Sequence, residues 1–114
     1  MDWSLAVDYC REEGEGDLVS IHSSEENNFL GDFILSSGYR TIFIGLSDTS
    51  GTFKDWSWSD GTRLDYTSWS PGYPAGNQRP GWNYAYLTFD WGRPIWRNLG
   101  QGSPHHFVCK VKIL

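Results

Sequence analysis

The two cysteines, Cys10 and Cys109, constrain this 114-residue chain more than any other feature, because they lie near its opposite ends. A disulfide between them would close a loop of about 100 residues, and the chain-entropy model gives such a bridge roughly 4.7 kcal/mol. The alternatives are two buried free thiols or half of a metal site, although no second cysteine lies at short spacing from either one and a site with His105 and His106 would want a third partner. We predict the disulfide, which indicates an oxidising, extracellular compartment.

Length and composition fit one domain, 1–114, with a single packed core, since 39% of the residues are hydrophobic and 17% aromatic. The formal net charge of −5 argues against a nucleic-acid partner. No apolar run approaches the roughly 20 residues that a membrane-spanning helix needs. The first residues also lack the basic start and apolar core of a signal peptide. We therefore expect a soluble domain without membrane insertion.

Two stretches have the spacing of amphipathic helices. Residues 2–13 carry apolar side chains at helical intervals and stop at glycines. A second helix is expected to begin at a capping box formed by Ser23 and Glu26 and to end at Gly38. Its predicted apolar face consists of Phe29, Leu30, Phe33 and Ile34.

Short strands are predicted at 18–21, 41–46 and 83–89, where apolar, β-branched or aromatic residues lie between turn signals. The C-terminal segment alternates apolar and basic residues, which predicts a half-buried strand that carries the second cysteine. The residues expected on its buried face are Phe107, Cys109, Val111 and Ile113.

The stretch 53–69 holds three of the seven tryptophans and alternates aromatic and polar residues on both sides of a turn signal at 59–61. It predicts a short hairpin whose aromatic face forms the floor of the domain. The composition then changes, because residues 71–99 are rich in proline and glycine and show no clear period before the predicted strand at 83–89. A long segment of this kind in a small domain is typical of a binding loop.

Several short motifs follow one another in a specific order and spacing. They are Trp3-x-x-Ala6-x-x-x-Cys10, Leu18-Val19-Ser20-Ile21, Phe43-Ile44-Gly45-Leu46, Trp58-Ser59-Asp60-Gly61, Trp69-Ser70-Pro71-Gly72, Trp96 and Phe107-Val108-Cys109. Together they resemble the C-type lectin-like domain family over nearly the whole chain. The resemblance implies an α+β fold, with two helices flanking small antiparallel β-sheets, a long ligand-binding loop and a bridge between Cys10 and Cys109. It also assigns Trp56, Trp58, Trp69 and Trp96 to core positions.

The chain departs from the family where calcium-dependent members bind their metal. Residues 73–75 read Tyr-Pro-Ala in place of a Glu-Pro-Asn or Gln-Pro-Asp triplet, whose proline is often cis. Residues 96–98 read Trp-Arg-Asn in place of Trp-Asn-Asp, and Trp82 stands where a further acidic ligand is usual. Calcium takes six to eight oxygens, yet Asp90 is the only acidic residue in 71–99. We therefore predict no metal site and no cofactor.

Family members also carry a strand before the first helix, paired with the C-terminal strand. Here the sequence reaches the first helix almost directly at Trp3, so either this sequence omits that strand or the edge beside residues 107–113 is open. An open edge can pair with another chain. This suggests a homodimer as a hypothesis.

Aromatic rings, guanidinium groups and amides in the long loop are the candidate ligand contacts. Rings can stack on a sugar or anchor a protein interface, arginines can clamp a carboxylate or sulfate, and amides can bond sugar hydroxyls. The alternatives are that the rings fill the space of the missing metal and that the polar groups are solvated. The candidates are Tyr73, Asn77, Arg79, Trp82, Trp91, Arg97 and Asn98.

The sequence does not predict an enzyme, because it shows no serine elbow, no free cysteine if the bridge forms and no paired carboxylates in the loop. We expect a calcium-independent ligand-binding module of a secreted or cell-surface protein that recognises a glycan or a protein through the long loop. The alternatives are a calcium-dependent carbohydrate-binding lectin and an ice- or mineral-binding domain.

Overall fold

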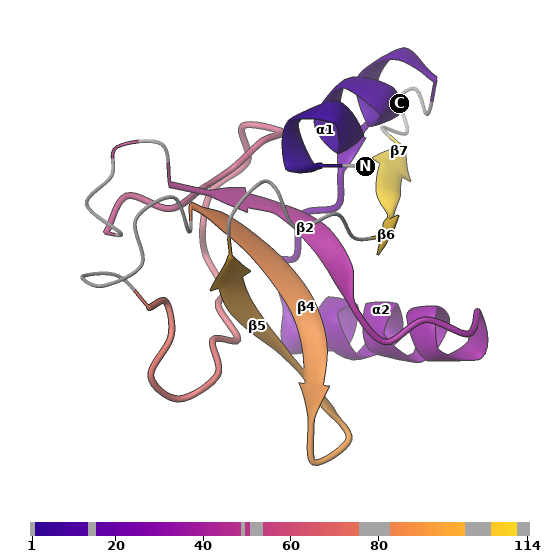
Figure 1. The fold of residues 1–114 in the computed structure, drawn as a ribbon, viewed down its shortest axis with the longest axis vertical. Coiled ribbons are helices and arrows are strands. Elements are labelled where there is room, and N and C mark those ends of the chain that lie inside the picture. Colours follow the sequence, from indigo (N-terminus) through magenta and orange to yellow (C-terminus); the bar gives the residue numbers. More distant parts are fainter. Residues whose placement is uncertain are drawn as a thin grey trace.

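The computed structural model describes residues 2–13, 16–48, 50, 54–75, 83–99 and 106–111. Within these residues the chain forms two helices and seven short strands, which is the expected α+β fold. Figure 1 shows α1 and β7 together at one end, while the β4–β5 hairpin projects toward the other. The elements are α1 (Trp3–Glu12), β1 (Gly16–Leu18), α2 (Ser24–Ser36), β2 (Ile42–Ser47), β3 (Ser57–Trp58), β4 (Tyr84–Asp90), β5 (Arg93–Leu99), β6 (His106–Phe107) and β7 (Cys109–Val111).

The strands form two sheets. β1 and β7 make a two-stranded antiparallel sheet. The larger sheet has the order β3-β2-β4-β5, and β6 adds to β2 in parallel. β4 and β5 are a regular hairpin, in which Asp90 faces Arg93 at the tip and Tyr84 faces Leu99 at the other end. No helix in the described part of the chain is long and apolar enough to span a membrane.

The first helix and the disulfide are as predicted. Asp2 caps α1, because its carboxylate accepts a hydrogen bond from the backbone N–H of Leu5 at 3.0 Å. The helix buries four side chains on one face, and one of them is Cys10. Cys10 is bonded to Cys109 of β7 with an S–S distance of 2.07 Å. The bridge therefore ties the first helix to the last strand.

The second helix begins at Ser23, as the capping motif predicts, since the Ser23 hydroxyl accepts from the backbone N–H of Glu26 at 3.1 Å. The predicted apolar face was partly wrong, because Phe29 and Phe33 are 73% and 49% exposed. Gly31 explains the difference. A Cβ at Gly31 would lie 3.1 Å from the Pro94 side chain, so the closest approach to β5 is on the glycine side of the helix. The buried residues of α2 are Asn27, Leu30, Gly31 and Ile34.

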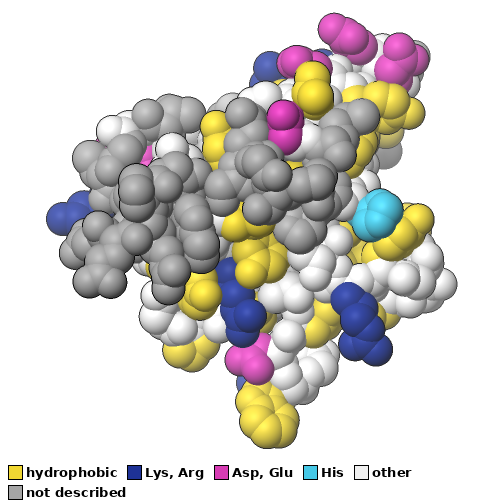
Figure 2. All heavy atoms as spheres, in the orientation of Figure 1, with side chains coloured by type: hydrophobic (Ala, Val, Ile, Leu, Met, Phe, Trp, Pro, Cys, Tyr) yellow, Lys and Arg dark blue, Asp and Glu magenta, His cyan; other side chains and the backbone are white. Residues whose placement is uncertain are grey.

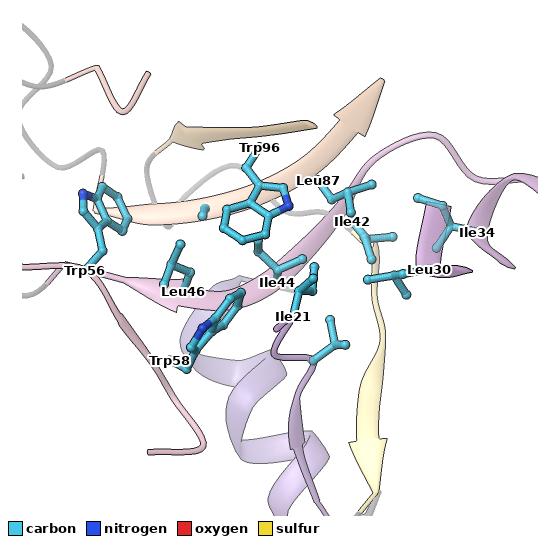
Figure 3. Close-up of a cluster of buried hydrophobic side chains, with 12 residues drawn as sticks. Ile21, Leu30, Ile34, Ile42, Ile44, Leu46, Trp56, Trp58, Leu87 and Trp96 are labelled. Carbon is cyan, nitrogen blue, oxygen red and sulfur yellow. The ribbon is translucent and has the colours of Figure 1, made fainter. Parts of the chain in front are cut away.

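β2 is buried along its whole length and separates two groups of core side chains, as its continuous apolar run predicts. One group includes Phe43 and packs against α1. The other includes Ile44 and contains three buried tryptophans. Figure 3 shows these tryptophans toward one end of the cluster and the α2 side chains Leu30 and Ile34 at the other. The buried tryptophans are Trp56, Trp58 and Trp96, whereas Trp69 is partly buried against them.

The hairpin predicted for 53–69 is wrong. β3 pairs with β2, placing Trp58 opposite Leu46, and the chain after the turn at 59–60 forms no further strand before its isolated bridge at Trp69. The side chain of Asp60 explains the local path. It accepts hydrogen bonds from Ser20 and Thr62, so the turn is attached to the segment before α2 instead of joining two strands. Phe53 lies outside the described residues.

Two further strand predictions need correction, and one strand was not predicted. The strand predicted at 18–21 lies earlier, at Gly16–Leu18, because a Cβ at Gly16 would collide with the carbonyl oxygen of Lys110 and only glycine fits beside β7. The C-terminal strand is divided at Val108 into β6 and β7, and Val111 is 54% exposed. Ile113 lies outside the described residues. β5 was missed entirely, because its proline and polar residues are typical of a loop.

Candidate functional site

The central residue of the candidate site is Asn98, a buried amide on β5 that is only 1% exposed. Its Oδ1 accepts a hydrogen bond from the backbone N–H of Ala75 at 2.7 Å. Its Nδ2 donates to the carbonyl oxygen of the same residue at 2.6 Å. This reciprocal pair holds residues 73–75 against β5. The Tyr73–Pro74 peptide bond within this triplet is cis, as the resemblance implies.

Arg97, next to Asn98, points to the opposite face of β5 because side chains alternate along a strand. Its guanidinium carbon lies 5.6 Å from the centre of the Tyr73 ring, which is a cation–π arrangement. Its register partner on β4 is Tyr86. Burial raises the pKa of the Tyr86 phenol, against the opposing effect of the Arg97 charge. Tyr73, Tyr86 and Arg97 therefore form one half-buried group, which we call the loop-end cluster.

The loop-end cluster is cationic. No carboxylate in the described part of the chain forms an ion pair with Arg97, and its Nε is buried without a hydrogen-bond partner there. Figure 2 shows acidic side chains gathered over α1, whereas basic and acidic side chains stand together among hydrophobic ones over the β4–β5 hairpin. The cluster thus offers a positive charge and aromatic surface together.

The residues at this end of β5 do not fit calcium. Among the described residues, no group of three His, Cys, Asp or Glu side chains could hold a metal ion. Ala75 contributes only a methyl group where calcium-dependent members have an oxygen ligand, and Arg97 brings a cation to the ring of Tyr73 in the same triplet. The amide of Asn98 is already engaged on both atoms. A divalent ion would have to break these bonds and approach a like charge.

The structure separates the predicted site residues. Tyr73, Arg97 and Asn98 are brought together at one end of the β4–β5 hairpin. Trp91 is 95% exposed in the turn at the other end, five residues after Tyr86 or roughly 17 Å along the direction of β4. Its left-handed backbone, with a φ of 53°, is that of a tight turn. The predicted residues Asn77, Arg79 and Trp82 lie outside the described residues.

Sequence reasoning missed Tyr86 and Ala75 as parts of this end of the hairpin. Tyr86 alternates with Tyr84 in the sequence, which indicates a strand and a packed segment but no contact with Arg97. Its position beside Arg97 depends on the register of β5, which was not predicted. Ala75 contributes through its backbone, and no side-chain pattern could have indicated that.

The chain matches the family model "Lectin C-type domain" over residues 1–111. It is 35% identical to rat lithostathine over 115 residues, covering 98% of this chain and 67% of that protein. A calcium-independent type II antifreeze protein has a similar structure, with a TM-score of 0.80 and 31% identity over 94% of this chain and 75% of that one. The carbohydrate-recognition domain of cow CD23, solved in the presence of an oligosaccharide, gives a TM-score of 0.74 and 34% identity over 94% of this chain and 76% of that one. The match to the lithostathine therefore spans about two thirds of that relative. The chain belongs to the C-type lectin domain family.

Proposed function

We propose that this chain is a calcium-independent, non-enzymatic binding module of a secreted or cell-surface protein, and that its loop-end cluster recognises a glycan. The observation that carries this proposal is the reciprocal pair of hydrogen bonds between Asn98 and Ala75. The backbone beside the ligand face is held by a side-chain amide, so no metal is needed to shape it. The disulfide between Cys10 and Cys109 supports an extracellular location.

The chemistry of the cluster suits a sugar. Tyr73 presents a ring that can pack against the apolar face of a pyranose, and Arg97 and Tyr86 offer hydrogen-bond donors beside it. The CD23 domain supports a glycan ligand, since it was solved in the presence of an oligosaccharide. The antifreeze protein supports calcium independence, since it is described as calcium-independent and shares this fold. We retain Asn77, Arg79 and Trp82 as ligand contacts predicted from the sequence.

A glycan array tests this proposal directly. The wild-type protein should bind the same glycans in millimolar calcium and in chelator, and Arg97→Ala should lose that binding. Arg40→Ala is the matched control, because Arg40 is an exposed arginine in the connection between α2 and β2. Binding that requires calcium would overturn the calcium-independent mechanism. Binding that survives Arg97→Ala would overturn the site. No glycan binding in either condition would refute the glycan ligand and make a protein partner the better hypothesis.

Self-association is a separate proposal that concerns the other end of the molecule. Within the described residues β7 pairs only with β1, so its second edge has no strand partner there. We propose that a second copy pairs at this edge to form a homodimer. A monomeric mass by light scattering at high protein concentration would refute it.

A further inference from the structure

A polar groove lies away from the loop-end cluster, between α2, the connection at 66–68 and the beginning of β5. Its volume is about 500 Å³, within the usual range for small-ligand sites. All of its lining residues belong to the described part of the chain. Those used in the argument are Asn27, Asn28, Tyr66, Ser68, Arg93 and Pro94.

The walls of this groove are held together by one buried side chain, Asn27, which is 2% exposed. Its Nδ2 donates to the carbonyl oxygen of Pro94 at 3.0 Å and lies 3.4 Å from the hydroxyl oxygen of Ser68. Its Oδ1 accepts from the indole N–H of Trp96 at 3.0 Å. A single amide therefore connects α2 to both other walls. The groove is preformed, so a ligand would not have to order it.

Three polar side chains that line the groove have no hydrogen bond or ion pair with other described residues. They are Asn28 on α2, Tyr66 on the connection and Arg93 on β5. The Tyr66 ring is held edge-on against Trp96, with ring centres 5.9 Å apart, so its hydroxyl has a defined position. An amide, a phenol and a guanidinium thus line one groove with their hydrogen-bonding capacity available.

The free groups specify the class of ligand. Amide and phenol groups both donate and accept, which matches sugar hydroxyls. Arg93 is the only charged residue that lines the groove, so it favours an anionic substituent that can take two parallel N–H bonds. We infer that this groove is a second, calcium-independent binding site for an acidic saccharide that bears a carboxylate or a sulfate. The site does not depend on the function proposed for the loop-end cluster.

The test uses two defined probes, a chondroitin 4-sulfate tetrasaccharide and the neutral maltotetraose, titrated in chelator with NMR mapping of backbone amides. The acidic probe should shift the amides of Asn28, Ser68 and Arg93. We expect Arg93→Ala to weaken its binding about tenfold and Tyr66→Phe about threefold. Arg40→Ala, the matched control, should leave the affinity unchanged. Urea unfolding of each variant should show that its stability is retained.

Every other result of this test contradicts the inference in a distinct way. Shifts around Ala75 and Arg97 that persist in Arg93→Ala would overturn the groove but support the loop-end cluster. Equal affinity for maltotetraose would overturn the acidic ligand. Equal weakening by Arg40→Ala would reduce the binding to non-specific charge attraction. No shift with either probe would remove the site.

Discussion

The two ends of β5 use the same pair of residue types in different ways. Each end has a buried asparagine whose amide is fully engaged, Asn98 at the loop end and Asn27 of α2 at the groove end. Each end also has an arginine. Arg97 is half-buried against Tyr73, whereas Arg93 is exposed beside the groove. The asparagines hold backbone segments in place at both ends, so the two ends differ in how exposed their arginine is.

The largest effect is expected at the groove end, on replacing Asn27. Asn27→Ala leaves the buried indole N–H of Trp96 without a partner and removes one of the two side-chain hydrogen bonds to the carbonyl of Pro94, which keeps the bond from Ser68 at 3.3 Å. An unpaired buried donor costs about 1–3 kcal/mol and a lost hydrogen bond about 1 kcal/mol, so we expect the free energy of unfolding to fall by roughly 3 kcal/mol. Urea denaturation measures this loss. Asn28→Ala, one position further along the same helix but exposed, is the control and should stay within about 0.5 kcal/mol. A loss below 1 kcal/mol for Asn27→Ala would show that the three walls do not depend on this amide.

A smaller loss is expected at the loop end, on replacing Asn98. Asn98→Ala removes both hydrogen bonds to Ala75, but it frees only a connecting segment instead of separating a helix from the sheet. We expect the free energy of unfolding to fall by about 2 kcal/mol. Hydrogen exchange at the amide of Ala75 should accelerate in this variant and not in Asn27→Ala. If Asn98→Ala destabilised the protein more than Asn27→Ala, the hydrogen bonds of Asn98 to Ala75 would contribute more to stability than those of Asn27, which contradicts the order that we expect.

The two arginines should differ less in stability than the two asparagines. Arg97→Ala loses the cation–π contact with Tyr73 and the packing of its side chain, which together are worth about 1 kcal/mol. Arg93→Ala removes an exposed side chain without a described partner and should change the free energy of unfolding by less than about 0.5 kcal/mol. Paired urea denaturation curves measure the difference. Equal losses would mean that Arg93 is as constrained as Arg97, and would weaken the argument that its guanidinium is available to a ligand.

The sequence predicted the parts of the fold that depend on local pattern. The helix at 2–13, the buried strand β2 and the bridge between Cys10 and Cys109 are confirmed. The two ends of β5 could not be predicted, because they are built from distant contacts. Asn98 bonds to a residue 23 positions away, and Asn27 to one 67 positions away.

Side-chain chemistry therefore indicated candidate residues at the loop end but not the contacts that they make with one another. Arg97 and Asn98 were predicted as ligand contacts on equal terms. The amide of Asn98 is hydrogen-bonded to the backbone of Ala75, so Arg97 beside Tyr73 is the group that we propose for ligand contact. The groove was not predicted. The sequence predicted a hairpin over 53–69, which would place Tyr66 in a strand, whereas Tyr66 lies in the irregular connection that lines the groove.

The smallest effect is expected in alkaline solution and concerns Tyr86 at the loop end. Burial raises the pKa of this phenol above its ordinary value of about 10, so the folded state favours the neutral form. The stabilisation is fully present below pH about 10 and is lost as the pH rises through the higher folded pKa. Tyr86→Phe should therefore show a shallower loss of stability above pH about 10 than the wild-type protein, measured by urea denaturation across that range. Tyr9→Phe makes the same chemical change on an exposed ring of α1 and corrects for tyrosine content. If both variants followed the same alkaline profile, the Tyr86 hydroxyl would not be held by its surroundings, and the loop-end cluster would be as open as the groove.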